Sequence, residues 1–377
     1  MTPVFVNARF LTQPLSGVQR YALEICQALD GLAAQRSVGP IIALYPARQK
    51  VVDPGWQNIE LRRVQGGRGH FWEQTALWQA SRTGRLISLC NSGPLRHDNQ
   101  IVALHDANIY AIPGAFSHSY RIFHSWMRPR LARRARRLIT VSAFSAQELA
   151  RYCGLSATDF RVIPNSADHL SGTAPDLARL YRFNLKPDHY LLAVGNQSPN
   201  KNIARLVAAH AQCPDAPVLA IAGGGANGLT HADIKGDDRI RNLGRIPDND
   251  LVALYKGAKG FVWPSLYEGF GIPPLEAMAL GTPVLSSSSS AMPDVLGDAA
   301  MYFDPSDTND ILRCLRAFQN LDPIKLDQIK ASGCAQARRY SWMDSANTLL
   351  DIVEEMPIPA SAARAQKMIS FRSSSEH

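Results

Sequence analysis

The sequence predicts an α/β protein with two doubly wound parallel sheets. Short apolar runs alternate along the chain with segments long enough for helices, which is typical of parallel strands joined by crossovers. The alternation stops in a proline-containing stretch, residues 164–188, and then begins again. With 377 residues, 46% of them apolar, the chain is too long for one ordinary domain and too apolar for disorder. We therefore expect two globular domains.

The first half opens on a strand, a glycine-containing turn and a helix. Pro3–Phe10 is rich in β-formers, a loop with Pro14 and Gly17 follows, and Val18–Leu29 has apolar residues at helical spacing. Apolar runs predict further strands at Ile41–Tyr45, Leu86–Leu89, Ile101–Leu104, Leu138–Val141 and Arg161–Ile163. We expect one open α/β sheet over residues 1–170.

The second half repeats the pattern after a linker, Pro164–Asp188, in which we expect one short helix. Strands are predicted at Tyr190–Val194, Val218–Ala222, Arg239–Leu243, Gly260–Val262 and Thr282–Ser286. Helices are predicted at Ile203–Ala211, Asp250–Gly257 and Pro274–Leu280. We expect a second α/β domain over residues 185–337 and a frayed tail over 360–377.

Cysteine usage and hydropathy exclude several classes of protein. The six cysteines are scattered, without a CxxC pair, which argues against a disulfide scaffold or a zinc module. The chain has no signal-peptide pattern at its start and no run of about 18 apolar residues. We expect a cytoplasmic protein that does not span a membrane.

Positive charge is concentrated in the first half. Residues 1–182 contain 22 Lys and Arg against 11 Asp and Glu, whereas the remainder contains 18 against 21. Arg121–Arg137 alone holds seven arginines, and we expect Pro129 to split it so that Leu131–Leu138 forms a short basic helix. The segment is either a solvated arginine face or a peripheral contact with the anionic inner face of the cytoplasmic membrane. Nucleic acid is not expected, because no recognition motif accompanies the charge.

The most informative stretch is Trp263–Val284, WPSLYEGFGIPPLEAMALGTPV. It follows a predicted strand, places Glu268–Gly271 in a loop, and is expected to start a helix near Pro273–Pro274 with Glu276 in the first turn. Glycines let backbone N–H groups approach a ligand, and a helix N-terminus favours an anion, so the stretch suggests a diphosphate site. The candidate ligand-binding residues in it are Tyr267, Gly269, Phe270, Gly271, Leu275 and Glu276.

These residues resemble a known motif. Glu268 and Glu276, with seven residues between them, are similar to the Glu-x7-Glu motif of the retaining glycosyltransferases of the GT-B fold, family 4. The Gly17 turn, His105–Asp106, VSAFS at 141–145, VIPN at 162–165 and VGNQSPNKN at 194–202 resemble the same family. The resemblance implies two Rossmann-like domains facing each other across a cleft, residues 1–170 for the acceptor and 185–337 for the nucleotide sugar. It also implies that a final helix, within about 338–357, packs back on the first domain.

Roles in the second domain follow from the resemblance. It implies that Glu268 contacts the donor sugar, that Glu276 binds the ribose, and that the amides of Phe270–Gly271 lie near the diphosphate. Lys201, in a loop after a strand, can neutralise a leaving diphosphate, the role that a metal plays elsewhere. Gly195 and Asn196 precede it and are further candidates for ligand binding.

One departure from the family pattern concerns positive charge, and two further candidates lie in the first domain. Asn196 stands where many family members have an arginine, and Arg9 or a residue near Gly17 could supply the missing charge. His105 follows a predicted strand, and the resemblance implies that it contacts the donor sugar at the reaction centre. Asp106 could orient the imidazole or bind an acceptor hydroxyl.

Two further sequence patterns resemble ligand-binding motifs but also have structural explanations. Gly223, Gly225 and Gly228 satisfy GxGxxG, but no helix clearly follows, so the segment is either a plain turn or a loop near the nucleotide. Asp248-Asn249-Asp250 is formally a DxD motif, but it precedes a helical pattern, so we expect either Asp to be an N-cap and the other to add favourable charge to the first turn. No metal or other cofactor is expected.

The combined expectation is a retaining, metal-independent hexosyltransferase with catalytic residues His105, Lys201 and Glu268. The donor is mannose from GDP-mannose, or a UDP-sugar, and the acceptor is a glycan, such as one linked to polyprenyl diphosphate, in bacterial surface or exopolysaccharide synthesis. The alternatives are a GT-B phosphorylase, a nucleotide-sugar epimerase, a non-catalytic nucleotide-sugar-binding protein, and an NAD enzyme built on the GxGxxG segment.

Overall fold

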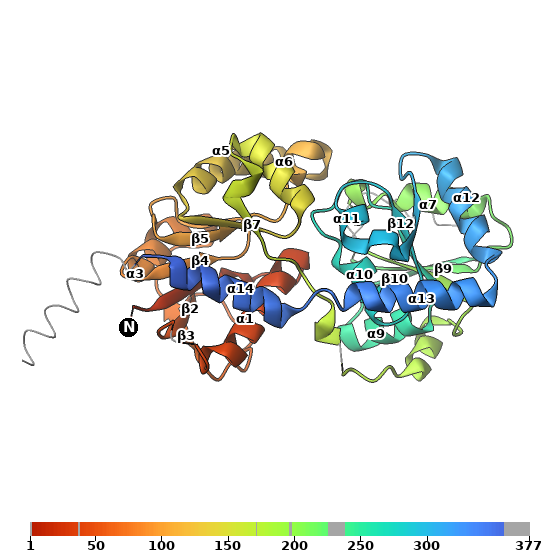
Figure 1. Ribbon diagram of the computed structural model, residues 1–377, viewed down its shortest axis with the longest axis horizontal. Helices are drawn as coiled ribbons and strands as arrows, with labels where there is room; N and C mark the ends of the chain where they lie inside the picture. Colours follow the sequence, from red (N-terminus) through yellow and green to blue (C-terminus); the bar gives the residue numbers. More distant parts are fainter. Residues whose placement is uncertain (1, 37, 171, 196–197, 225–237, 358–377) are drawn as a thin grey trace, which may run out of the picture. The chain divides into compact units, whose positions relative to one another are not determined.

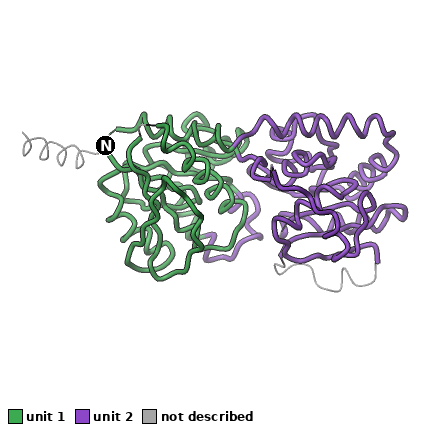
Figure 2. The backbone as a smooth tube through the Cα atoms, turned by 90° about the horizontal axis from the view of Figure 1, so that it is seen from below, with its two compact units in different colours: residues 1–107, 122–164, 342–377 green, residues 108–121, 165–341 purple. Residues whose placement is uncertain are grey.

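The chain divides into two compact units, each built around one parallel sheet (Figures 1 and 2). The computed structural model describes residues 2–36, 38–170, 172–195, 198–224 and 238–357. Unit 1 comprises residues 1–107, 122–164 and 342–377, and unit 2 comprises residues 108–121 and 165–341. The expected tail over 360–377 lies outside the described residues.

Unit 1 contains a seven-stranded parallel sheet with strand order β3-β2-β1-β4-β5-β6-β7. The strands are β1 (Val4–Asn7), β2 (Ile41–Pro46), β3 (Ile59–Val64), β4 (Arg85–Ser88), β5 (Gln100–Ala103), β6 (Arg137–Thr140) and β7 (Phe160–Val162). Six of them confirm predicted strands, five to within one residue at each end, whereas β1 ends three residues before the end of the predicted Pro3–Phe10 segment. β3 was not predicted, because this edge strand, IELRRV, is half exposed and carries charged residues.

Helices cover both faces of this sheet (Figure 1). They include α1 (Gly17–Ala33), α2 (Gly69–Trp72), a π-helical turn (Glu73–Leu77), α3 (Trp78–Ser81), α5 (His118–Arg134), α6 (Ala143–Cys153) and α14 (Trp342–Glu355). α14 is the last helix of the described chain, yet it packs against α1, and the ring of Trp342 lies edge-on to Tyr21 at 5.9 Å between centroids. Unit 1 is therefore completed only by the C-terminal part of the chain.

The expectation that Pro129 splits the basic segment is wrong. α5 runs without a break from His118 to Arg134, with Pro129 inside it. A proline removes one helical hydrogen bond and crowds the preceding turn, but Met127 and Leu131 on either side are fully buried. This burial holds the helix together across the proline. Within the described ranges, no helix is both long and apolar enough to cross a membrane.

Unit 2 contains a six-stranded parallel sheet with strand order β10-β9-β8-β11-β12-β13. The strands are β8 (Tyr190–Val194), β9 (Val218–Ala222), β10 (Ile240–Gly244), β11 (Gly260–Trp263), β12 (Val284–Ser287) and β13 (Ala300–Phe303). The helices include α7 (Ile203–Ala211), α9 (Asp248–Gly257), α10 (Ile272–Ala279), α11 (Met292–Leu296), α12 (Thr308–Gln319) and α13 (Pro323–Ala337). Among these described elements, the short edge strand β13 and the helices α11, α12 and α13 were not predicted.

Each sheet reverses its strand order once. In unit 1 the chain moves outward from β1 to β3 and returns to β4 on the other side of β1. In unit 2 it moves outward from β8 to β10 and returns to β11 on the other side of β8. Ligands of open α/β sheets bind beyond the carboxyl ends of the strands at such a reversal. The loops after β1, β4, β8 and β11 are therefore the places to look for a site.

The Asp248–Asp250 segment begins α9, but neither aspartate is its N-cap. The N-cap is Pro247, which places both aspartates in the first turn, where negative charge is favourable. The side chain of Asp250 is only 3% exposed and pairs with Arg179 at 2.6 Å and Arg182 at 3.1 Å. Both arginines lie on the short helix η6 (Leu177–Phe183), which confirms the helix expected in the linker. Asp250 thus has a structural role in joining this helix to α9.

Asp250→Ala should lower the free energy of unfolding by roughly 1–3 kcal/mol, because it removes the charge-assisted hydrogen bonds that join η6 to α9. Urea unfolding followed by circular dichroism measures the change. Asp327→Ala is the matched control, since Asp327 is 77% exposed in its pair with Lys330 and should cost less than about 1 kcal/mol. Equal effects of the two substitutions would contradict the structural role of Asp250.

Candidate functional site

The loops that follow β8 and β11 are joined by hydrogen bonds from and to two asparagines. Asn202 donates from Nδ2 to the carbonyl oxygens of Pro264 at 3.1 Å and Pro305 at 2.8 Å. The backbone N–H of Leu266 donates to the carbonyl of Asn200 at 2.8 Å. Asn202 adopts a left-handed conformation with φ 55°, which asparagine tolerates better than most residues. The PNKN turn therefore has a fixed position beside the loop after β11.

These hydrogen bonds between the loops hold Lys201 and Glu268 in contact. Lys201 Nζ lies 2.6 Å from Glu268 Oε1 and 4.5 Å from the centre of the Trp263 ring. The two charged side chains are 18% and 14% exposed, so the pair is largely shielded yet open to a ligand. A lysine in this position can exchange its carboxylate partner for a phosphate, and the aromatic face limits where the ammonium group can move.

Glu268 is also held through its backbone. Its N–H donates to Ser290 Oγ at 2.9 Å, and Ser290 adopts φ 57°, a left-handed conformation that is rare for serine. Backbone strain of this kind concentrates at functional sites. Ser290 was not foreseen, because it lies in a run of five serines that carries no positional signal.

The glycine turn after Glu268 is tightly packed. Gly271 has φ 89°, and a Cβ there would lie 2.5 Å from Met292 Cε. It is the N-cap of α10, whose second and third residues are Pro273 and Pro274. Since proline has no N–H, an anion at this helix end would meet the amides of Gly271 and Ile272. The expectation that Glu276 lies in the first turn is wrong: α10 starts at Ile272, which makes Glu276 its fifth residue.

Glu276 is buried and held by two side chains from distant parts of unit 2. Tyr255 donates from its hydroxyl to Oε2 at 2.8 Å, and His169 Nε2 lies 3.1 Å from Oε1. Burial and the neighbouring carboxylate raise the pKa of Tyr255 well above its ordinary value, so it remains a donor. Each carboxylate oxygen can accept more than one hydrogen bond, so Glu276 is oriented and retains capacity for ligand hydroxyls. Neither Tyr255 nor His169 was predicted.

The apolar candidates of the motif face the core. Tyr267, Phe270 and Leu275 are 7%, 4% and 0% exposed, and Phe270 packs edge-on against Tyr340. Gly269 is buried as well. Any ligand contact from Phe270 or Gly269 therefore involves the backbone.

His105 and Asp106 belong to unit 1, beyond the carboxyl end of β5. His105 is 5% exposed, and its Nε2 donates to the carbonyl of Leu89 at 2.7 Å. Burial lowers the pKa of His105, so the ring is neutral and Nδ1 carries a lone pair. Asp106 was expected to orient this ring or to bind an acceptor hydroxyl. The observed contact that orients the ring is the one with the carbonyl of Leu89. Asp106 Oδ1 lies 3.9 Å from Arg128 Nη1.

The remaining candidates are glycines and one asparagine. Gly17 is the exposed first residue of α1. Gly195 and Gly223 directly follow β8 and β9, and a Cβ on Gly195 would contact the Lys201 side chain at 3.5 Å. Asn196, Gly225 and Gly228 lie outside the described residues. Arg9, considered as a substitute charge, is bound to Glu73 and Ser92 in unit 1.

Taken together, the unit 2 site offers one ammonium group, two carboxylates and the amides of a glycine turn. The ammonium group and the amides suit a phosphate group, and the carboxylates suit hydroxyl groups. Such an arrangement can hold a phosphorylated, hydroxyl-rich molecule and stabilise negative charge that develops on its phosphate.

Family comparisons match both halves of the chain. Residues 182–332 match the family described as glycosyl transferases group 1, and residues 74–169 match glycosyltransferase family 4. The second match includes His105, and the first includes Lys201, Glu268 and Glu276.

Individual proteins resemble the chain over different lengths. It is 31% identical to the O-antigen chain mannosyltransferase B of Escherichia coli, over 66% of this chain and 68% of that protein. It is 31% identical to the E. coli serotype-specific mannosyltransferase WbdA, over 58% of this chain but only 28% of that protein. Among solved structures, Anabaena Alr3699/HepE in complex with UDP and glucose has a TM-score of 0.75 at 17% identity, over 94% of this chain and all of that one.

The ion pair between Lys201 and Glu268 should be detectable by a double-mutant cycle. We expect Lys201→Met and Glu268→Gln to be non-additive in urea unfolding by roughly 1–3 kcal/mol, because the pair is a largely shielded, charge-assisted hydrogen bond. A cycle on the exposed Asp327–Lys330 pair should give a coupling near zero. Additive effects at Lys201 and Glu268 would show that the contact contributes nothing.

Proposed function

The chain belongs to the group 1, or family 4, glycosyltransferases, which have the GT-B fold, and we propose that it transfers mannose from GDP-mannose to a glycan with retention at the anomeric carbon. The observation that carries the proposal is the Lys201–Glu268 pair at the strand-order reversal of unit 2. The names of the E. coli relatives support mannose. UDP in the Anabaena complex makes a UDP-sugar the alternative donor.

The contacts of unit 2 support specific roles for its side chains. Lys201 would leave Glu268 in part to bind the outer phosphate of the diphosphate, and Glu268 would then accept hydroxyl groups of the sugar. Glu276, oriented by Tyr255 and His169, would accept the ribose hydroxyls. The amides beside Gly271 would bind the remaining diphosphate oxygens.

We propose a displacement on one face of the sugar. The bond from the anomeric carbon to the diphosphate oxygen breaks with its electron pair on the phosphate, while the acceptor oxygen bonds to the same face of the carbon. The acceptor's proton moves to the departing phosphate. Lys201 stabilises the negative charge that develops there, so no resident metal is required for this step. Neutral His105 would accept a hydrogen bond through Nδ1 from the sugar or the acceptor.

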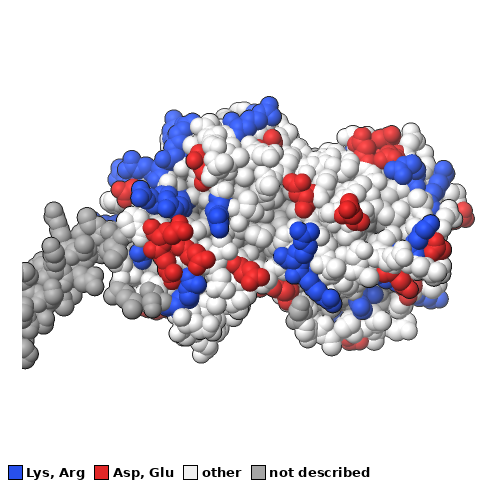
Figure 3. Space-filling view, in the orientation of Figure 1, with Lys and Arg blue, Asp and Glu red and all other residues white. Residues whose placement is uncertain are grey.

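The acceptor we propose is a glycan on a lipid carrier, in bacterial surface polysaccharide synthesis. Support comes from the mannosyltransferases of O-antigen chains among the relatives and from the surface of α5. Ile122 and Trp126 are 56% and 48% exposed there, and Arg130 stacks on Trp126 at 4.6 Å. Figure 3 shows basic side chains gathered on unit 1 over the edge that carries α5 and α6. Exposed apolar groups beside arginines are typical of helices that bind an anionic lipid surface.

A donor panel tests the reaction. With EDTA present, release of nucleotide diphosphate from GDP-mannose should exceed release from UDP-glucose and other UDP-hexoses. Lys201→Met should lower turnover at least 100-fold, because one of the main charges on the leaving group is lost. Lys259→Met is the control and should retain turnover, because Lys259 directly precedes β11, at the opposite end of that strand from Trp263. Equal turnover of Lys201→Met and wild type would contradict the proposed role.

Vesicle sedimentation tests the membrane contact. The chain should bind vesicles with 30% phosphatidylglycerol more than neutral phosphatidylcholine vesicles, and 0.5 M NaCl should weaken binding by screening the charges. The double variant Trp126→Ala/Arg130→Glu should lose most of the binding. The control, Ile324→Ala/Lys325→Glu, alters another exposed apolar–basic pair, on α13. Equal loss in both variants would contradict a specific α5 surface.

A further inference from the structure

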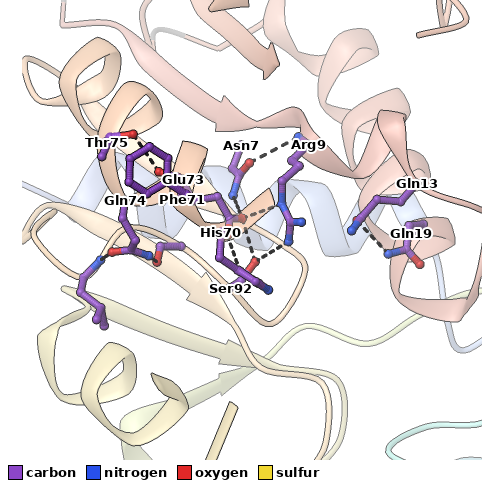
Figure 4. Close-up of polar contacts among 12 residues, drawn as sticks. Asn7, Arg9, Gln13, Gln19, His70, Phe71, Glu73, Gln74, Thr75 and Ser92 are labelled. Atoms are coloured by element: carbon purple, nitrogen blue, oxygen red, sulfur yellow. Dashed lines mark hydrogen bonds and ion pairs between the residues drawn. The ribbon is translucent and has the colours of Figure 1, made fainter. Parts of the chain in front are cut away.

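Unit 1 contains a buried polar cluster at its own strand-order reversal. Asn7 is the last residue of β1, and Ser92 follows the end of the neighbouring strand β4. Both contact Glu73, which enters from the helical segment after β3. Figure 4 shows these side chains converging, together with Arg9 and His70. The cluster therefore lies where an open α/β sheet ordinarily binds its ligand.

Glu73 is the centre of the cluster. Its side chain is fully buried, and Oε1 accepts hydrogen bonds from Asn7 at 2.9 Å, Arg9 at 3.0 Å and Ser92 at 2.8 Å. His70 Nδ1 lies 2.8 Å from Oε2. Burial by itself raises the pKa of Glu73, but the hydrogen bond from His70 and the charge of Arg9 outweigh it and lower the pKa below its ordinary value. Glu73 is thus a buried carboxylate.

The carboxylate fixes the imidazole of His70. Because Glu73 Oε2 engages Nδ1, the other ring nitrogen, Nε2, is the one left to bind a hydroxyl group of a ligand. The His70 side chain is 29% exposed, in contrast to the fully buried Glu73. Glu73 also begins a π-helical turn, Glu73–Leu77, an irregularity that is frequent at functional sites.

An exposed aromatic ring lies beside this imidazole. The ring centres of His70 and Phe123 are 4.8 Å apart, and Phe123 is 36% exposed. An aromatic face packs against the C–H face of a sugar ring, while an adjacent nitrogen binds one of its hydroxyls. Phe123 and His70 together therefore offer both kinds of contact that a sugar ring makes.

We propose that His70, held by Glu73, binds a hydroxyl group of the acceptor saccharide, whose ring packs on Phe123. The inference rests on the proposed function, since it names the acceptor site of that reaction. His70 touches the saccharide, whereas Glu73 and Arg9 are positioning residues that act through His70.

The test uses octyl α-D-mannopyranoside as the saccharide and the full chain with GDP or GDP-mannose. In His70→Ala and His70→Gln, the acceptor KM should rise at least tenfold, while the KM for GDP-mannose and its hydrolysis without acceptor stay within twofold of wild type. Glu73→Gln should raise the acceptor KM less, because its amide oxygen can still accept from Nδ1. His189→Ala, an exposed histidine of unit 2, is the control and should leave both KM values unchanged.

Saturation-transfer NMR of the octyl mannoside, with GDP present, separates this inference from the proposed function. Binding by wild type that His70→Ala abolishes supports the site even if no donor is turned over, in which case the proposed function alone fails. Equal binding by wild type and His70→Ala, or no binding by wild type at millimolar concentration, overturns the inference. The inference is also overturned if His70→Ala and His70→Gln leave the acceptor KM unchanged. In that case, normal hydrolysis of GDP-mannose leaves the proposed function standing.

Discussion

The site in unit 2 depends on the reversal of strand order between β8 and β11. Two parallel strands that are neighbours in a sheet end at the same edge, so the loops after them must meet even though about seventy residues of chain separate them. Asn200 and Asn202 turn this proximity into a fixed geometry by bonding to the backbone of the other loop. The contact between Lys201 and Glu268 follows from that geometry.

Most of the fold was predictable because buried parallel strands are continuous apolar runs. β8 and β9 match their predicted bounds residue for residue, and α7 does as well. β3 escaped prediction because this edge strand is half exposed and its residues are mixed in polarity. β13, AMYF, is apolar but only four residues long, and it was not predicted either. The continuity of α5 through Pro129 could not be foreseen either, since it depends on burial by residues distant in the sequence.

Site residues were predictable only where each of them lies in a short sequence motif. Lys201 in PNKN and Glu268 in its glycine turn are parts of short motifs, and their contact is in the structure. Tyr255 and His169 reach Glu276 from 21 and 107 residues away. The Glu73 cluster likewise joins residues 7, 73 and 92. Only the packing of the chain brings such residues together.

The resting contact between Lys201 and Glu268 bears on which molecules the pocket would retain. When a nucleotide diphosphate without a sugar binds the ammonium group of Lys201, the carboxylate of Glu268 loses its counterion. That carboxylate then lies close to the negative charge of the diphosphate, which is unfavourable in a largely buried site. A molecule that carries a sugar beyond the phosphate supplies hydroxyl donors for that carboxylate. On the proposed function, the spent nucleotide is therefore the poorer ligand, and its departure restores the ion pair and frees the pocket for the next turnover.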